Sequence, residues 1–274
     1  MKEETYLLDK ACRFMNVAGT YLEEDEYKDI VAFNIHMALE LAFSFVVERL
    51  LRVYKPPMYM AYKREFPVQA THNLSHVCYV LSSYVDFPVY LAFPLTQMNG
   101  WCVNSRYSES FSDSVEQRNL VIIYNAVGRF LATLGLLLSV KHVDKELGDA
   151  GLKGKITYYR NKLYVVAESE EKQEEFFKVI EANSELIEEF CRSSQEDYKF
   201  ICAFMSNLEM VGFRQVFVKL MSHSKLTDED LEKVRKCLGF MRIENYQDFM
   251  KKLGGYANKY GVSEEKFKEI MGSA

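Results

Sequence analysis

The chain has 274 residues, of which 49% are hydrophobic and 27% charged, so it can bury a core and is not expected to be disordered. It contains only 13 Gly and 5 Pro, which argues against a turn-dense β-sandwich and favours long helices. The net charge of −5 excludes nucleic-acid binding driven by overall charge, because neither residues 1–150, at −4, nor residues 151–274, at −1, are basic.

Residues 1–147 contain four segments with apolar residues at helical spacing. These segments predict helices over residues 4–20, 29–54, 72–84 and 115–142. Pro56 and Pro57 are expected to stop the second helix, and Thr71 is the expected N-cap of the third. The aromatic-rich stretch 86–114 is expected to be a functional loop or to contain a short helix. An antiparallel helical bundle is the predicted fold of this half.

The segment GDAGLKG, residues 148–154, has three glycines in seven residues and is the predicted linker between two domains. After it, two β-rich runs on either side of Arg160-Asn161 predict a hairpin over residues 156–167. The rest of residues 155–274 returns to helical patterns. Helices are expected over residues 169–193 with Ser169 as N-cap, over 195–223 with an interruption at Gly212, after Thr227, over 246–260 and after Ser263. The expected fold class is therefore all-α, with a second helical region that contains one small β-hairpin.

The N-terminus, MKEETYLLDKACRFMNV, is charged from its second residue, which is unlike a signal peptide. The longest apolar run, residues 130–140, is shorter than the roughly 18 residues of a membrane span. None of the six cysteines forms a Cys-x-x-Cys pair, and buried free thiols are expected rather than disulfides or metal ligands. We therefore expect a cytoplasmic protein without a membrane contact, a metal or a cofactor.

Glu40 is a charged residue within the apolar pattern of residues 29–54. A buried carboxylate needs a partner, because an unpaired buried charge costs several kcal/mol. His36 lies one helical turn before Glu40 and can supply that contact. Glu40 is therefore either a structural contact inside a bundle or an acid that faces a ligand.

His72 and Asn73 lie at the predicted start of the third helix, and His76 follows one turn later. Two histidines four residues apart can bind a metal, but no acidic residue accompanies them as in a His-Glu-x-x-His site. Hydrogen bonds at the helix start are the main expectation for His72 and Asn73. Contact between this helix N-terminus and a phosphate is the alternative.

Arg106 and Tyr107 lie in the hydroxyl-rich segment WCVNSRYSESFSD. An arginine can hold a phosphate or a carboxylate by two hydrogen bonds, and a tyrosine can stack or donate one. The alternative is a buried ion pair between Arg106 and Glu40. Arg118 and Tyr124, near the start of the fourth helix, are possible additional site residues, and Arg118 is expected to be exposed.

Together these motifs resemble the HEPN domain, a helical nucleotide-binding family, over residues 27–140. Three pieces carry the likeness in the family's order: Ala38-Leu39-Glu40 is similar to its Ala-x-Glu helix, Thr71-His72-Asn73-Leu74 to its His-Asp/Asn-Leu helix start, and Ser105-Arg106-Tyr107-Ser108 to its Thr-Arg-Tyr-Pro loop. The resemblance implies a helical bundle, homodimerisation, and either nucleotide binding or RNA cleavage. Residues 155–274 resemble no family that we recognise.

Ribonuclease members of that family carry an Arg followed by a His after four to six residues, and this sequence has no such pair. The nearest candidate, Arg118, has Ile123, Tyr124 and Asn125 at those positions, and a tyrosine with a pKa of about 10 is a poor base near neutral pH. We therefore expect a HEPN-like protein without catalytic residues that binds a nucleotide, a nucleic-acid end or a protein partner. The alternatives are a divergent ribonuclease of toxin or defence type and a regulatory adaptor that acts through its C-terminal helices.

Overall fold

A computed structural model describes residues 2–65, 73–83, 85–159, 162–210, 251, 254–255, 258–259 and 262–271. The chain is mainly helical with one small β element, which confirms the expected fold class. It divides into two compact units. Unit 1 comprises residues 1–139 and 193–204, and unit 2 comprises residues 140–192 and 205–274.

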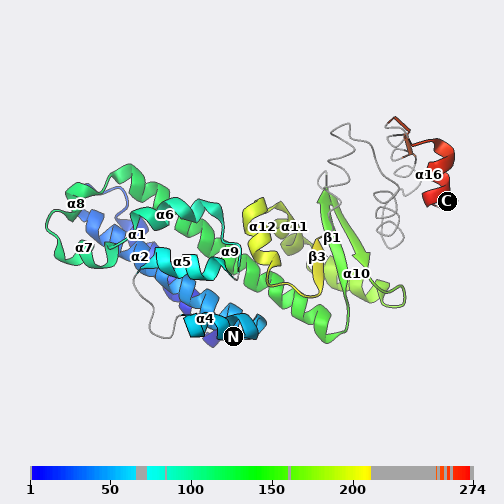
Figure 1. Cartoon of the computed structure of the whole chain (residues 1–274), viewed down its shortest axis with the longest axis horizontal. Helices are drawn as coiled ribbons and strands as arrows, with labels where there is room; N and C mark the ends of the chain where they lie inside the picture. Colours follow the sequence, from blue (N-terminus) through cyan, green and yellow to red (C-terminus); the bar gives the residue numbers. More distant parts are fainter. Residues whose placement is uncertain are drawn as a thin grey trace. The chain divides into compact units, whose positions relative to one another are not determined.

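Unit 1 is a helical bundle in which α1 packs along α2, and α2 also contacts α5 and α7 (Figure 1). Its elements are α1 (Lys2–Thr20), η1 (Asp25–Tyr27), α2 (Lys28–Phe45), the π-helical η2 (Val46–Leu51), α3 (Arg52–Tyr54), α4 (Pro56–Glu65), α5 (Leu74–Ser82), η3 (Val89–Leu91), α6 (Ala92–Gln97), α7 (Trp101–Tyr107), α8 (Phe111–Ser114), the first part of α9 (Gln117–Asp149), and α12 (Gln195–Cys202).

The α2 helix is buried on several sides, as its wide apolar stripe predicts. Ten of its side chains are buried: Val31, Ala32, Asn34, Ile35, His36, Ala38, Leu39, Ala42, Phe43 and Phe45. A fully buried Leu, Ile or Phe side chain stabilises a fold by roughly 1.5–3 kcal/mol relative to exposure, so α2 contributes much of the driving force for unit 1.

Three helix boundaries in unit 1 differ from the sequence expectation. The chain breaks at Lys55, but α4 begins at once with Pro56, because proline suits the first helical position, where an N–H would have no intrahelical partner. The third helix begins at Leu74, and its N-cap is Asn73 rather than Thr71. The fourth continues past residue 142 to Asp149. The stretch 86–114 contains four short helical elements, which confirms the second of its two interpretations.

The α12 helix belongs to unit 1 although it follows 53 residues of unit 2, Val140–Arg192, in the chain. The ring of Phe200 is fully buried and lies 5.4 Å from Phe87, 5.5 Å from Phe130 and 5.6 Å from Phe204 between ring centroids. Phe43 extends this cluster through Phe87 and Phe130. Edge-on and tilted ring pairs at such distances stabilise a core beyond the area they bury.

The division into units therefore differs from the predicted domains 1–147 and 155–274 with their linker at 148–154. The division falls within α9 after Ser139, and α12 returns to unit 1. A glycine count locates a change in backbone conformation, which is present at Gly151 with a φ of +64°. It does not reveal which side chains pack together beyond that point.

Unit 2 is built around a three-stranded sheet, in the order β2-β1-β3. The predicted hairpin is confirmed: β1 (Gly154–Tyr159) pairs antiparallel with β2 (Lys162–Ala167), from Gly154 opposite Ala167 to Tyr159 opposite Lys162. The third strand, β3 (Leu208–Met210), pairs parallel with β1 and was not predicted. The other described elements are α10 (Gln173–Ala182), α11 (Ser184–Arg192) and α16 (Glu264–Met271).

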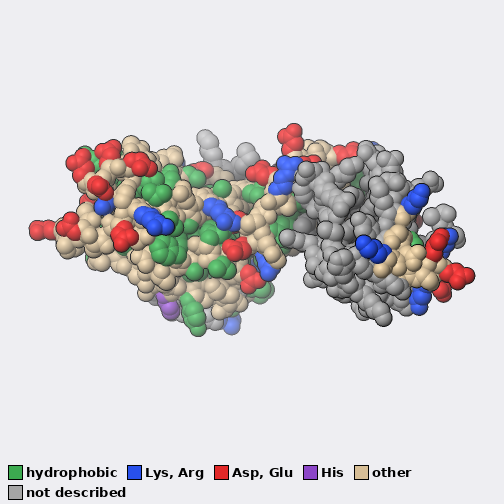
Figure 2. Space-filling view, turned by 90° about the horizontal axis from the view of Figure 1, so that it is seen from above, with side chains coloured by type: hydrophobic (Ala, Val, Ile, Leu, Met, Phe, Trp, Pro, Cys, Tyr) green, Lys and Arg blue, Asp and Glu red, His purple; other side chains and the backbone are tan. Residues whose placement is uncertain are grey.

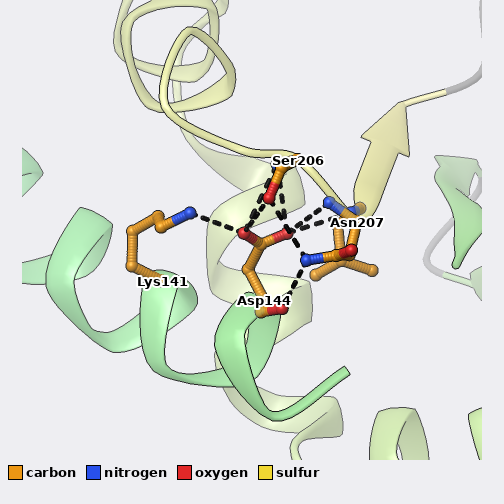
Figure 3. Close-up of polar contacts among 5 residues, drawn as sticks. Lys141, Asp144, Ser206 and Asn207 are labelled. Carbon is orange, nitrogen blue, oxygen red and sulfur yellow. Dashed lines mark hydrogen bonds and ion pairs between the residues drawn. The ribbon is translucent and has the colours of Figure 1, made fainter. Parts of the chain in front are cut away.

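Asp144 of α9 fixes the start of β3 (Figure 3). Its fully buried carboxylate accepts hydrogen bonds from the backbone N–H groups of Ser206, Asn207 and Leu208, at 2.7–3.3 Å, and from the ammonium of Lys141 at 2.5 Å. Burial acts to raise the pKa of Asp144, but the hydrogen bonds from Lys141 and the backbone outweigh it and lower the pKa below 3.8. The pair is thus held as an ion pair inside unit 2.

Several expectations for the second half need correction. The helix expected from Ser169 begins at Gln173, and it is interrupted at Asn183, which separates α10 from α11. The helix expected over 195–223 ends at Cys202. The last helix is confirmed, since the hydroxyl oxygen of Ser263 accepts a hydrogen bond from the N–H of Lys266 at the start of α16. The interruption at Gly212, the helix after Thr227 and most of residues 246–260 lie outside the described residues.

Among the described residues, two helical runs are long and apolar enough to cross a membrane, Asp25–Tyr54 and Gln117–Asp149. Their most apolar 18-residue windows have mean hydropathies of 1.9 and 1.8, and 67% and 44% of these windows are buried. The sequence expectation missed them because it counted uninterrupted apolar residues, whereas single polar residues interrupt both helices. A buried core helix of a soluble protein has the same length and composition.

The cysteines that the structure describes form no disulfide. Cys78 and Cys102 are buried, as expected, whereas Cys12 is exposed on α1. Burial raises the pKa of Cys202 to about 11, against the opposing effect of a hydrogen bond with Tyr198, so this thiol stays protonated at neutral pH. Cys237 lies outside the described residues.

Candidate functional site

Glu40 and His36 lie one turn apart on α2 and meet as the sequence predicts. The Nε2 atom of His36 lies 3.7 Å from a carboxylate oxygen of Glu40. The imidazole is fully buried, and the side chain of Glu40 is 16% exposed. The carboxylate of Glu40 therefore contacts a buried histidine and is itself partly exposed to solvent. This arrangement fits a structural contact.

Arg106 lies on α7, which packs against α2. Its Nε donates a hydrogen bond to the backbone oxygen of Cys102 at 2.6 Å, and the guanidinium lies 5.4 Å from the ring centre of Phe33 and 5.3 Å from that of Tyr107. The alternative of a buried ion pair with Glu40 is wrong, because Arg106 is exposed and makes these contacts instead.

Glu40 and Arg106 nevertheless both act on the Cys102 thiol of α7. Burial is the main cause that raises the pKa of the Cys102 thiol; the charge of Arg106 lowers it and the charge of Glu40 raises it. Both charges are thus close enough to Cys102 to act on it. The structure brings these two predicted residues together without joining them.

Tyr107 follows Arg106 at the end of α7 and is 76% exposed. An exposed aromatic ring beside an exposed arginine provides a stacking surface and a cation on one face. Acidic side chains lie over the same end of unit 1, where α7 and α8 are found (Figure 2). The exposed acids of these elements and their neighbours are Asp25, Glu26, Glu109, Asp113 and Glu116.

Asn73 is exposed and caps α5, because its side-chain oxygen accepts a hydrogen bond from the N–H of His76 at 3.0 Å. This confirms the expected hydrogen bond at a helix start. His72 lies outside the described residues, so its role at the helix start stays a prediction. The α5 helix contacts α2, the helix that carries Glu40.

Arg118 is exposed at the start of α9, as expected. Tyr124 has a packing role: its hydroxyl oxygen would lie 2.6 Å from a Cβ atom added to Gly19, so α1 and α9 approach closely at this point. A hydroxyl held against a helix backbone is poorly placed to serve as a base. Nothing in the structure places Arg118 and Tyr124 with Arg106.

Sequence reasoning missed a polar cluster that holds α12 in unit 1. Asp197 of α12 accepts hydrogen bonds from Arg129 at 2.7 and 3.0 Å, from Tyr90 at 2.7 Å and from Ser194 at 2.8 Å. The guanidinium of Arg129 also lies 4.0 Å from the ring centre of Tyr90. Burial acts to raise the pKa of Asp197, but these hydrogen bonds lower it overall. The sequence signal that could have indicated this cluster is Arg129, a single charged residue among apolar neighbours in α9.

The described residues contain no group of three or more His, Cys, Asp or Glu side chains placed to bind a metal ion. No family model, curated protein or solved structure matches the chain. The resemblance to the HEPN family is therefore a prediction that rests on the three motifs and their order. The case for a function rests on the geometry of Arg106 and its neighbours.

Proposed function

We propose that unit 1 is a non-catalytic, HEPN-like binding domain whose ligand is a nucleotide or the phosphate-bearing end of an RNA. The observation that supports this proposal most is the exposure and orientation of the Arg106 guanidinium. Its guanidinium is exposed, lies near two aromatic rings and is oriented by two hydrogen bonds to Cys102, from Nε to the backbone oxygen and from one Nη group to Sγ. An arginine fixed in this way loses little side-chain entropy when it binds a phosphate.

Tyr107 supplies the second element of such a site, since its exposed ring offers a face on which a base can stack. Stacking of one base on an aromatic side chain contributes roughly 1–3 kcal/mol by alanine substitution. Glu40, at the edge of the same region, can accept a hydrogen bond from a ribose hydroxyl or a base amino group. The three side chains together suit a ligand of about one nucleotide.

The acidic side chains around α7 and α8 limit the size of the ligand (Figure 2). A long polyanion would meet Asp25, Glu109 and Asp113, all of them exposed, and be repelled. A mononucleotide or a single terminal phosphate places its charge at Arg106 alone. This charge distribution favours a small phosphate ligand over an extended nucleic acid.

The alternatives have weaker support. A divergent ribonuclease that uses Tyr124 lacks support, because this tyrosine packs against Gly19. The adaptor hypothesis concerns C-terminal helices that lie mostly outside the described residues. Unit 1 does expose large apolar side chains among polar ones (Figure 2), including Tyr79, Val89 and Phe93. Scattered exposure of this kind is common on soluble proteins.

A thermal-shift series tests the proposal. The full chain, with Arg106→Ala and Tyr107→Ala variants, is melted with AMP, ADP, ATP and a short RNA with a 5′-phosphate. We expect the ligand to stabilise the wild type, and Arg106→Ala to weaken binding by about tenfold or more, because a charge-assisted hydrogen bond is lost. Arg13→Ala, an exposed arginine on α1, is the matched control and should bind like the wild type. No stabilisation by any of the four ligands, or equal stabilisation of Arg106→Ala, would contradict the proposal.

A further inference from the structure

Unit 2 contains a cavity of about 320 Å³ beside the glycine-rich segment 148–154. Its innermost lining is apolar: Leu152, Ala167 and Phe176 line it and are each 1% exposed. The outer lining is polar and includes Lys153, Glu168 and Lys172, which are exposed. An apolar interior with a few polar groups at the rim is typical of sites for small organic molecules.

The wall of this cavity is held in place by the Asp144 network (Figure 3). Asn207 lines the cavity, and its side-chain Nδ2 donates to the backbone oxygen of Asp144 at 2.8 Å. The backbone oxygen of Asn207 accepts a hydrogen bond from Gly154 at 3.0 Å, which links the end of the segment to the same wall. A Cβ atom added to Gly148 would lie 2.8 Å from Nδ2 of Asn207, so a larger residue at position 148 would force the Asn207 side chain to shift. These contacts hold the Asn207 side of the cavity wall in place.

Lys172 brings a positive charge to the rim. Its ammonium donates to the backbone oxygens of Ala150 at 3.3 Å and Gly151 at 3.2 Å, which satisfies carbonyl groups beyond the C-terminus of α9. An ammonium has three N–H groups, so one remains for a ligand. The α10 helix begins at the next residue, Gln173, without a side-chain cap, and its positive end adds to the attraction for an anion.

Lys153 and Glu168 are backbone neighbours, since the N–H of Glu168 donates to the oxygen of Lys153 at 2.9 Å. Both side chains line the cavity, yet no ion pair joins them in the described part of the chain. Two lysines and one glutamate give the lining a charge of +1. This positive charge is complementary to an anion, and Glu168 can accept a hydrogen bond from a hydroxyl or amino group on the ligand.

We propose that this cavity binds a small organic anion, a carboxylate or a phosphate monoester on an apolar body, with the anionic group between Lys153 and Lys172 and the body against Phe176 and Leu152. A volume of about 320 Å³ lies at the lower end of the range of about 300–1,000 Å³ that is typical of small-molecule sites, so the ligand is a small organic molecule. This site is separate from Arg106, which lies in unit 1.

Glycine signals in NMR spectra provide the test, because the full chain labelled with ¹⁵N-glycine has 13 of them. The probes are 3-phenylpropionate, phenyl phosphate and the neutral 3-phenylpropan-1-ol. We expect the anions to shift the Gly148 and Gly151 signals with dissociation constants on the order of 1 mM or tighter, and to leave those of Gly19 and Gly128 in unit 1 unchanged. The alcohol should bind about tenfold more weakly. Binding of one anion alone identifies the headgroup, carboxylate or phosphate.

Variants of the cavity complete the test. Lys153→Gln should weaken both anions about tenfold, whereas Lys145→Gln, an exposed lysine of α9 outside the lining, should not. Ala167→Leu should fill the cavity and abolish binding while the remaining glycine signals keep their positions. Arg106→Ala should leave binding unchanged, which separates this site from the proposed function of unit 1. Absence of shifts at about 10 mM of both anions, equal binding of the alcohol, or unchanged binding in Lys153→Gln would overturn the proposal.

Discussion

Truncation of Phe200 to alanine should destabilise unit 1 strongly, because this residue completes a core from a distant part of the chain. The ring is 0% exposed and lies within 5.4–5.6 Å of the rings of Phe87, Phe130 and Phe204. Phe-to-Ala changes in a core cost about 3–5 kcal/mol, and three ring contacts place Phe200 at about 4 kcal/mol. A domain is stable by only about 5–15 kcal/mol, so the loss is large.

Tryptophan fluorescence during urea unfolding measures this effect in unit 1. The chain has one tryptophan, Trp101, which lies in unit 1 and is 5% exposed. With a denaturant slope of about 2 kcal/mol/M, a loss of about 4 kcal/mol lowers the midpoint by about 2 M. Phe93→Ala is the matched control, because Phe93 lies in the same unit but is 40% exposed, and it should lower the midpoint by under about 0.5 M.

Equal midpoint shifts for the two variants would refute this reasoning. That result would mean that α12 does not complete the core of unit 1, and that the aromatic cluster reaches its full stability without Phe200. A change in slope rather than midpoint would indicate that the transition has ceased to be two-state.

The remaining predictions concern buried polar groups and the contact between α1 and α9. Asp144→Ala should destabilise unit 2 by about 3–5 kcal/mol in circular-dichroism unfolding, because it removes the buried ion pair with Lys141 and the acceptor of three backbone N–H groups at the start of β3. Added Lys141→Met should restore at least half of that loss; no recovery would refute the role of the charge. The pKa values of Asp144 and Asp197 are lowered in the fold, so their contribution to stability is complete above about pH 4 and is lost as the pH falls through the lowered values. The melting temperature should therefore stay constant from pH 7 to about pH 5 and fall below about pH 4, and it should fall less steeply in Asp197→Asn. A melting temperature of the wild type that begins to fall near pH 6 would contradict the lowered pKa values of these two carboxyl groups. Gly19→Ala should cost about 1–3 kcal/mol through its clash with Tyr124, and Tyr124→Phe should relieve it in the double variant; additive losses would show that the clash lies elsewhere.

Helical periodicity was sufficient to predict the main helices of unit 1, and two β-rich runs were sufficient to predict the hairpin of unit 2. These elements depend on local patterns, such as the apolar stripe of α2 and the paired β-rich runs around residues 160–161. The start of α4 at Pro56 was missed because proline can begin a helix as well as end one. The strand β3 was missed because three residues carry too little pattern, and Asp144 positions them from far away in the chain.

The candidate site could be predicted in part. Arg106, Asn73 and the contact of His36 with Glu40 followed from residue type and spacing, whereas the neighbours of Arg106 depend on how α7 packs on α2. The return of α12 to unit 1 could not be inferred, because the partners Arg129 and Asp197 are 68 residues apart. The cavity of unit 2 was hidden for the same reason, since its lining combines the predicted linker with residues from two later segments.

The relative affinity of AMP and adenosine tests the central claim most directly, since the two ligands differ only in the phosphate. Isothermal titration of the full chain should show AMP binding at least about tenfold more tightly than adenosine, because Arg106 contributes a charge-assisted hydrogen bond to the phosphate. In Arg106→Ala this ratio should fall to about one, with adenosine affinity unchanged. A ratio that is the same in both proteins, or no preference for AMP in the wild type, would contradict the assignment of Arg106 as the phosphate-binding residue.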